Sequence, residues 1–270
     1  MGLEDDRPHF FRHLGPQWWE RRDDTIAGGA IVQPTIRVPG TPMPRISMLA
    51  TYADNAGGLD ASMSFGSVAP TLDLSVHVVR CPGSSDFTYE SRLIKVGRRV
   101  TVAETWFTGA GDADPYAVAV STFVVVGEPE PDGVVLPSHL DPPFSPPVPL
   151  DVPIEDHVGI TTVAPGVVDI EHRPSVGNSR GTLQGGMVAL VAERACETLL
   201  EAEGVPHVVT SIDLRYLSPM RVGPVRTTAT LLRAHGELAQ LWVEVRDLGT
   251  EHLMTHVVAD AIPLDTFRVR

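Results

Sequence analysis

Two adjacent glycines, Gly185 and Gly186, stand at the start of a segment whose composition is typical of a helix. The first amide N–H groups of a helix have no partner within the helix and lie at the positive end of its dipole. Glycine leaves these amides bare of side chains, so they can bind a carbonyl oxygen that becomes an oxyanion during a reaction. The pair is therefore a candidate oxyanion site. It is equally consistent with a tight turn or with close packing.

An acidic residue, Glu193, follows within the same segment. A carboxylate can activate water or attack a carbonyl carbon directly. However, Glu193 lies eight residues beyond Gly185, which corresponds to ~12 Å along a helix axis. One carbonyl group cannot contact both residues. The acid that serves Gly185 must therefore come from a different helix.

The elements that position these groups occur twice along the chain. Residues 71–74 (TLDL) match residues 211–214 (SIDL) at an offset of 140, and the turns around Gly97 and Gly236 match at an offset of 139. Internal repeats of this kind indicate two copies of one structural unit. Each copy has one helical segment followed by four runs typical of strands.

Different residues mark the ends of the two predicted helices. The second spans residues 184–203, contains no proline and ends at Gly204. The first spans residues 44–55, with Pro44 in its first turn and the pair Gly57-Gly58 at its end.

At an offset of 139, Asp54 in the first predicted helix corresponds to Glu193 in the second. If the two helices pack antiparallel, Asp54 faces Gly185, and Glu193 faces the start of the first helix. That start, at residues 44–47, has no glycine pair. We therefore predict one competent site with Asp54 beside Gly185, and one degenerate site that contains Glu193. The opposite assignment, with Glu193 as the working acid, stays open.

A central helix wrapped by an antiparallel sheet, twice in one chain, is a double hot-dog, and the predicted fold class is α+β. Nine prolines between residues 127 and 153 favour a linker over a helix or a central strand. The predicted organisation is an N-terminal segment (1–25), a first, degenerate hot-dog (26–127), a Pro-rich linker (128–153) and a second hot-dog (154–265).

Gln184-Gly185-Gly186, then Glu193, then the run at residues 211–219 resemble the hot-dog acyl-CoA thioesterases, over roughly residues 155–262. The most similar branch is typified by phenylacetyl-CoA and hydroxybenzoyl-CoA thioesterases. That family usually has His-Gly-Gly at the helix start, and here Gln184 replaces the histidine.

The resemblance implies hydrolysis of an acyl-CoA to a free acid and CoA, in lipid metabolism. It implies that Gly185 donates its amide to the oxyanion, and that an acid acts as base or nucleophile. It implies no cofactor beyond the CoA of the substrate. The Gln184 side chain then offers a hydrogen bond to the thioester oxygen.

Further candidates surround the helix start. Asn178 either orients the water or substrate, or is an ordinary turn residue after a glycine. Gly186 is a candidate for substrate binding. The CoA phosphates require cations, and the candidates are Arg173, Arg180, Arg215 and Arg221.

Two other functions remain open. Residues 177–181 form a G-x-S-x-G pattern around Ser179, with Asp247 and either His252 or His256 in the order of an α/β-hydrolase triad. That fold needs alternating strands and helices, which this chain lacks. The second alternative is a hot-dog protein that binds acyl-CoA without hydrolysing it.

The composition of the chain excludes several classes of binding partner. The 270 residues carry a formal net charge of −13, which argues against nucleic acids and anionic membrane surfaces. The sequence contains no apolar stretch long enough to span a membrane. Two widely separated cysteines form no disulfide framework or zinc site and favour a reducing, cytoplasmic setting. We expect a homo-oligomer.

Overall fold

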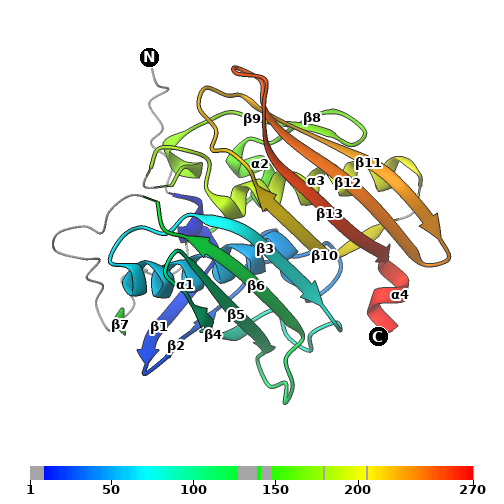
Figure 1. Cartoon of the computed structure of the whole chain (residues 1–270). Coiled ribbons are helices and arrows are strands. Elements are labelled where there is room, and N and C mark those ends of the chain that lie inside the picture. The colour runs from blue at the N-terminus through cyan, green and yellow to red at the C-terminus, as the bar shows by residue number, and fades with distance from the viewer. Residues whose placement is uncertain (1–8, 127–138, 141–147, 179, 205, 270) are drawn as a thin grey trace.

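A computed structural model describes residues 9–126, 139–140, 148–178, 180–204 and 206–269 (Figure 1). The first half contains one long helix and the four strands that follow it: α1 (Ile46–Phe65), β3 (Thr71–Val78), β4 (Phe87–Val96), β5 (Val100–Gly109) and β6 (Ala117–Val124). The second half repeats this order: α3 (Gly185–Ala202), β10 (His207–Tyr216), β11 (Val225–His235), β12 (Leu238–Asp247) and β13 (His252–Pro263).

Shorter elements complete each half. Those of the first half and the connection are η1 (Phe10–His13), β1 (Pro16–Arg22), β2 (Thr25–Ala30), η2 (Pro34–Ile36) and β7 (His139–Leu140). Those of the second half are α2 (Ile154–Val158), β8 (Thr161–Ala164), β9 (Val167–Ile170), η3 (Pro174–Val176) and α4 (Leu264–Val269).

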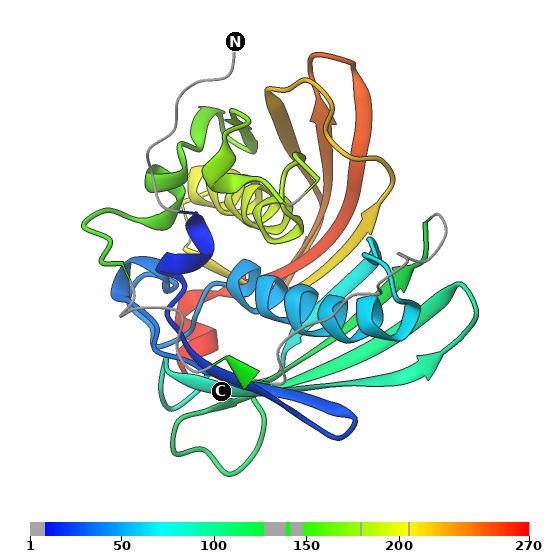
Figure 2. The same cartoon turned by 90° about the vertical axis from the view of Figure 1, so that its left-hand side faces the viewer.

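One continuous sheet joins the two halves. Its order within the described residues is β7-β1-β2-β4-β5-β6-β3-β10-β13-β12-β11-β9-β8, and the two halves meet where β3 pairs with β10. The order on one side of this junction mirrors the order on the other. The sheet curves around the two long helices, which lie on its inner side (Figures 1 and 2). The structure therefore confirms the predicted double hot-dog.

The repeat is confirmed, but its offset in the strands differs from the prediction. Leu93 pairs with Ala103 in the first half, and Leu231 pairs with Leu241 in the second, 138 residues later. A register irregularity follows both pairs at the same place. The predicted offsets of 140 and 139 are thus wrong by one or two residues in the strands. The helices keep the offset of 139, because Arg45 and Gln184 are their N-caps.

Helix α1 is longer than predicted, because Gly57-Gly58 lie inside it and do not end it. A Cβ atom on Gly57 would lie 2.9 Å from atoms of Ala103 and Phe123, so this glycine lets the helix approach the sheet closely. The helix ends instead at Gly66, whose φ of 66° is left-handed. Asp54 consequently lies near the middle of the helix, and not near its end.

Helix α3 matches the prediction closely. Gln184 caps its start and Glu203 caps its end. It is followed by Gly204, which has a φ of 83°. Most of its side chains are buried, since it packs between the sheet and α1.

The N-terminal segment contributes to the first sheet. β1 and β2 form an antiparallel hairpin, and β2 pairs with β4. The predicted boundary at residue 25 therefore falls inside this hairpin. Most of the predicted Pro-rich linker (127–138 and 141–147) lies outside the described residues. No helix in the described part of the chain has the length and apolar character needed to span a bilayer.

Candidate active site

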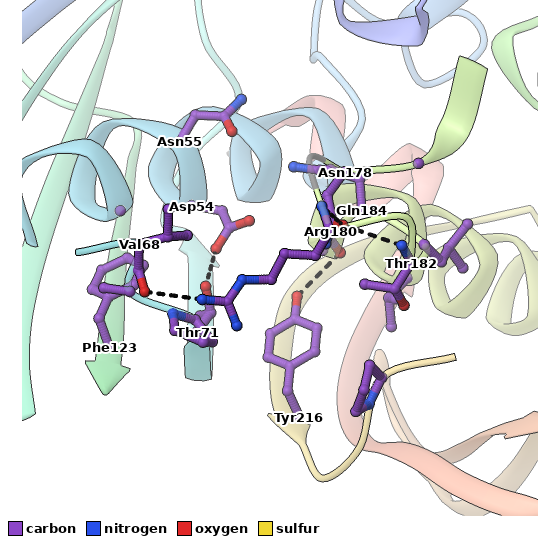
Figure 3. A pocket seen from close by; sticks show the side chains of 18 of the residues that line it. Asp54, Asn55, Val68, Thr71, Phe123, Asn178, Arg180, Thr182, Gln184 and Tyr216 are labelled. Atoms are coloured by element: carbon purple, nitrogen blue, oxygen red, sulfur yellow. Dashed lines mark hydrogen bonds between the residues drawn. The ribbon is translucent and has the colours of Figure 1, made fainter. Parts of the chain in front are cut away.

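Asp54 of α1 and Gly185 at the start of α3 face each other, as the antiparallel packing of the two helices predicts. A Cβ atom on Gly185 would lie 2.8 Å from Asp54 Oδ2. The carboxylate and the helix start therefore come from different halves of the chain. Figure 3 shows Asp54 and Gln184 on facing elements at the edge of one pocket.

The helix start offers one free amide. The Gln184 Oε1 atom accepts hydrogen bonds from the N–H groups of Gly186 and Met187. For the Gly185 N–H, the structure shows no acceptor among the residues that it describes. This N–H belongs to the first helical residue, which has no intrahelical partner. Gly185 is thus the amide that remains available to a ligand.

Gly185 and Gly186 are glycines for different structural reasons. A Cβ atom on Gly186 would lie 1.8 Å from Thr51 Oγ1, so Gly186 is required for the close contact between α1 and α3. With its amide occupied by Gln184 and its Cα against Thr51, Gly186 is not positioned to bind substrate. These contacts give no support to the prediction that Gly186 binds substrate. The packing explanation thus holds for Gly186, whereas Gly185 faces the carboxylate.

Only part of the Gln184 side chain is available to a ligand. Its carbonyl oxygen caps its own helix, which leaves only the Nε2 group for other contacts. The residue lines the cavity, and no acceptor for Nε2 occurs within the described residues. The amide can still donate one hydrogen bond into the site.

Asp54 is held by a residue that the sequence analysis did not assign to the site. The Thr71 hydroxyl, at the start of β3, donates to Asp54 Oδ1 at 2.5 Å. Burial raises the pKa of Asp54 to about 6, although this hydrogen bond lowers it. A carboxyl group with this pKa is ionised at neutral pH and basic enough to accept a proton from water. Thr71 leaves Oδ2 free to face Gly185.

Tyr216, the last residue of β10, is the second unassigned member of the site. Its hydroxyl donates to the Gly185 carbonyl oxygen at 3.1 Å. It also lies 3.3 Å from the position of a Cβ atom on Gly185. Burial, and then the charge of Asp54, raise the pKa of Tyr216 above its ordinary value. The phenol therefore stays a neutral hydrogen-bond donor that fixes the helix start.

These groups line one large cavity of about 1370 Å³. Its walls come from both halves of the chain and include Asp54, Thr71 and Phe123 from the first, and Gln184, Gly185 and Tyr216 from the second. The cavity is large enough for a drug-sized or larger ligand. A polar centre with apolar walls is the usual form of such a site.

Of the four predicted cations, two line the cavity, and Arg173 and Arg215 do not. Arg180 and Arg221 line the cavity, and Arg180 donates from Nη2 to the Val68 carbonyl oxygen at 3.2 Å. Arg215 does not line it, because this residue lies at the β3–β10 junction and pairs with Asp73 at 3.3 Å. The geometry thus gives no support to Arg215 as a ligand of the same substrate.

Asn178 is a turn residue in this structure. Its Oδ1 atom accepts hydrogen bonds from the N–H groups of Arg180 and Thr182, at 2.9 and 3.2 Å. The side chain thus shapes the loop that precedes α3, and this loop carries Arg180 along the cavity (Figure 3). The turn interpretation is the one that the contacts support.

The pseudo-equivalent position holds no comparable cavity. Glu193 accepts hydrogen bonds from the N–H groups of Ile46 and Ser47, at 3.3 and 3.1 Å, and from Ser47 Oγ at 2.5 Å. Its carboxylate therefore caps the start of α1 directly. Burial raises the pKa of Glu193, against the lowering effect of Arg45 and Ser47. Glu193 lies outside the cavity lining.

A cluster of buried ion pairs lies beside Glu193 at the start of α1. Arg45, which is 3% exposed, pairs with Glu197 at 2.6 Å and Glu155 at 2.7 Å, and lies 3.8 Å from Glu193. Burial lowers the pKa of Arg45, but the neighbouring carboxylates together raise it above its ordinary value, so Arg45 stays charged. The cluster connects α1, α2 and α3. The second position is therefore a structural contact between the two halves.

The α/β-hydrolase alternative is wrong. All strand pairs in the described residues are antiparallel, so the parallel sheet of that fold is absent there. Asp247 accepts four backbone N–H groups, which lower its pKa to about 2 against the effect of burial, and the His256 ring packs at a tilt against Trp242. Ser179 lies outside the described residues. No cluster of three or more metal-binding side chains occurs in the described part of the chain.

Solved structures that resemble this chain share its fold along nearly the whole length. A conserved protein of unknown function with a hot dog fold from Alicyclobacillus acidocaldarius is 12% identical, with a TM-score of 0.59, covering 94% of this chain and 97% of that one. The tesB protein from Mycobacterium avium subs paratuberculosis is 14% identical, with a TM-score of 0.61 and coverage of 94% and 98%. The 12:0-ACP thioesterase from Umbellularia californica is 11% identical, with a TM-score of 0.61 and coverage of 88% and 94%.

Sequence comparison adds a family match over part of the chain. No curated protein matches the sequence. Residues 180–253 match the family model described as the thioesterase superfamily. This range contains Gly185 and Glu193 but not Asp54, and it does not distinguish the predicted branch. The chain is therefore a double hot-dog protein, and residues 180–253 in its second half are similar to the thioesterase superfamily.

Proposed function

We propose that the protein hydrolyses an acyl-CoA thioester to a free acid and CoA. The observation that carries this proposal is the Asp54 carboxylate facing the free amide of Gly185 inside a large cavity. A helix-start amide suits the oxyanion of acyl transfer, and a carboxylate with a raised pKa suits activation of water. The thioesterase-superfamily match supports the same reaction class.

The groups act in the following order. The thioester oxygen accepts hydrogen bonds from the Gly185 N–H and the Gln184 Nε2 group. Asp54 accepts a proton from a water molecule, whose oxygen attacks the carbonyl carbon. The tetrahedral oxyanion collapses, the C–S bond breaks, and the leaving thiolate receives the proton from Asp54. Thr71 and Tyr216 hold the carboxylate and the helix start in place throughout.

Direct attack by Asp54 on the carbonyl carbon is the alternative chemical route. It produces an acyl anhydride that water then hydrolyses. A single turnover in water enriched in heavy oxygen identifies an anhydride that water opens at the Asp54 carboxyl carbon. That route places the heavy oxygen in Asp54 and leaves the product acid unlabelled, whereas general-base catalysis labels the product acid and leaves Asp54 unlabelled.

The charges of the cavity and of the whole chain favour CoA as the carrier of the acyl group. Arg180 and Arg221 line the cavity, and no carboxylate of the described residues forms an ion pair with either. The phosphates of CoA suit two such cations. An acidic carrier protein is disfavoured by the net charge of −13, since like charges repel over an extended interface.

The proposal is tested by measuring thiol release from acyl-CoA thioesters with the purified chain. Calorimetry with the same thioesters is run in parallel. Steady thiol release above the uncatalysed rate supports hydrolysis. Binding without thiol release rejects hydrolysis and supports the acyl-CoA-binding alternative.

A further inference from the structure

The residues that line the cavity extend well beyond the acid and the helix start. One arm follows α1 past Asp54, where Asn55, Leu59 and Ser62 line it at helical spacing. Opposite this face of α1 lie side chains from the β1–β2 hairpin and β4, namely Trp19, Ile26 and Tyr89. Figure 2 shows the hairpin beside α1.

Within the residues that the structure describes, the second half has no such arm, although it repeats the same elements. Its hairpin, β8–β9, has strands of only four residues. At the turn of this hairpin, the Gly166 N–H donates to Thr198 Oγ1 at 3.1 Å. A Cβ atom on Gly166 would lie 3.3 Å from Leu199 Cβ, so the turn packs directly on α3. At the helix offset of 139, Thr198 is the counterpart of Leu59. The first half is thus open where the second is closed.

One glycine keeps the arm open. Trp19, Gly28 and Tyr89 lie in one cross-strand row, so they share a face of the sheet. A Cβ atom on Gly28 would lie 2.3 Å from the Tyr89 hydroxyl oxygen. The Tyr89 ring therefore lies flat over Gly28. Any side chain at Gly28 displaces that ring toward α1.

An ion pair joins β1 to α1 beyond the residues that line the arm. Arg21 of β1 lies 3.5 Å from Asp60 and 3.7 Å from the Met63 sulfur, both on α1. From Asp54 to Ser62 the helix advances eight residues, which is ~12 Å. The arm therefore has mostly apolar walls, and its lining on α1 ends near the point where this ion pair joins the two elements.

We infer that this arm binds an unbranched apolar acyl chain, and that Leu59 and the Gly28–Tyr89 contact set the greatest length accepted. The inference rests on the proposed hydrolysis and specifies its substrate. The thioester carbon lies at Asp54 and Gly185, and the chain extends along α1 toward Arg21. Each methylene group buried in the arm raises kcat/KM about fourfold. Chains longer than the arm lose this gain because Arg21 and Asp60 block them.

The test is a series of straight-chain acyl-CoA thioesters from acetyl to stearoyl. For the wild type, kcat/KM rises with length to a medium-chain optimum and then falls. Leu59→Trp fills the arm, so kcat/KM for the optimal chain falls about sixtyfold, equivalent to three methylene groups denied burial. Its kcat/KM for the acetyl and butyryl thioesters falls by a much smaller factor, because these chains are too short to reach Leu59. Leu232→Trp is the matched control, since Leu232 is exposed and lies outside the cavity, and it leaves the whole series unchanged.

Gly28→Ala provides an independent variant, because it moves Tyr89 into the arm without adding bulk to α1. Thermal melts verify that each variant is folded at the assay temperature. Equal rates along the series in the wild type, or an equal loss at every length in both variants, overturn the inference.

Failure of the inference is separable from failure of the proposed function. Binding of straight-chain carboxylic acids is followed by the fluorescence of Trp19, with Trp19→Phe to identify the signal. If the wild type releases no thiol, hydrolysis is rejected. Binding that increases with chain length and is lost in Leu59→Trp then still supports the arm. Binding that is independent of length overturns it.

Discussion

The Asp54 carboxylate lies 2.8 Å from the point where a Cβ atom on Gly185 would stand, although 131 residues separate the two in sequence. Neither half of the chain contains both groups at one site. The counterpart pair, Glu193 and Ile46, is joined by a direct hydrogen bond at 3.3 Å with no cavity for a ligand. The repeat has therefore kept the packing at both positions but an open site at only one.

The pH dependence of hydrolysis follows from Asp54. Because burial raises the pKa of Asp54 to about 6, the base is protonated below that pH and ionised above it. We expect kcat/KM to rise with pH, with a midpoint near 6, and to reach a plateau near neutrality. The Thr71 hydrogen bond lowers this pKa, so Thr71→Val moves the midpoint upward. A pH–rate profile of both proteins measures the shift, and Thr71→Ser, which keeps the hydroxyl, leaves the midpoint in place.

The two glycines at the helix start are expected to respond differently to alanine. Gly185→Ala places a methyl group against Asp54 and the oxyanion position, so hydrolysis falls by about 10²–10³-fold. Gly186→Ala overlaps Thr51 and reduces the free energy of unfolding by about 1–3 kcal/mol. Rates and denaturant unfolding of both variants give the comparison. A loss of stability alone in Gly185→Ala contradicts its role in the site.

The ionised Asp54 carboxylate is expected to lower the free energy of unfolding at neutral pH. Its pKa is about 6 in the folded chain and about 3.9 in the unfolded chain, so the folded state binds the proton more tightly. The resulting stability is present below pH 4 and is lost as pH rises to 6. Unfolding free energies of the wild type and Asp54→Asn are therefore expected to differ by about 2–3 kcal/mol more at pH 8 than at pH 4, in favour of Asn. A pH-independent difference contradicts the buried, ionised carboxylate.

Glu193 is expected to matter for stability and not for hydrolysis. Glu193→Gln keeps an acceptor for the N–H groups of Ile46 and Ser47 but removes one charge beside Arg45. Because Arg45 keeps Glu155 and Glu197, the expected loss of unfolding free energy is about 1–3 kcal/mol. Urea unfolding measures it, with Glu244→Gln on the sheet surface as the control. An unchanged midpoint contradicts the structural role.

Helix geometry explains why the facing pair could be predicted from sequence. The ~12 Å separation between Gly185 and Glu193 along one helix excludes a shared substrate, and the repeat supplies Asp54 as the alternative. Thr71 and Tyr216 were not predicted as site residues because a strand residue reaches the site only through the sheet's register and curvature. Tyr216 even lies within the motif used for the resemblance, but nothing in the spacing shows where its hydroxyl points.

The structural roles of the glycines were the hardest to predict from the sequence. A glycine pair such as Gly57-Gly58 is typical of a helix end. In the structure both residues lie inside α1, where they allow the helix to approach Phe123 closely. Gly185-Gly186 look alike in the sequence, yet one faces a carboxylate and the other a helix. A glycine shows only that a side chain is excluded. What excludes it depends on tertiary packing.

The most direct test compares hydrolysis of a medium-chain acyl-CoA by Asp54→Asn and Glu193→Gln, both measured at pH 8 below their melting temperatures. Loss of the catalytic carboxylate in Asp54→Asn is expected to lower kcat by about 10²–10⁴-fold. Glu193→Gln is expected to keep kcat near the wild-type value. Full activity in Asp54→Asn, or a loss confined to Glu193→Gln, contradicts a single working site between the two halves.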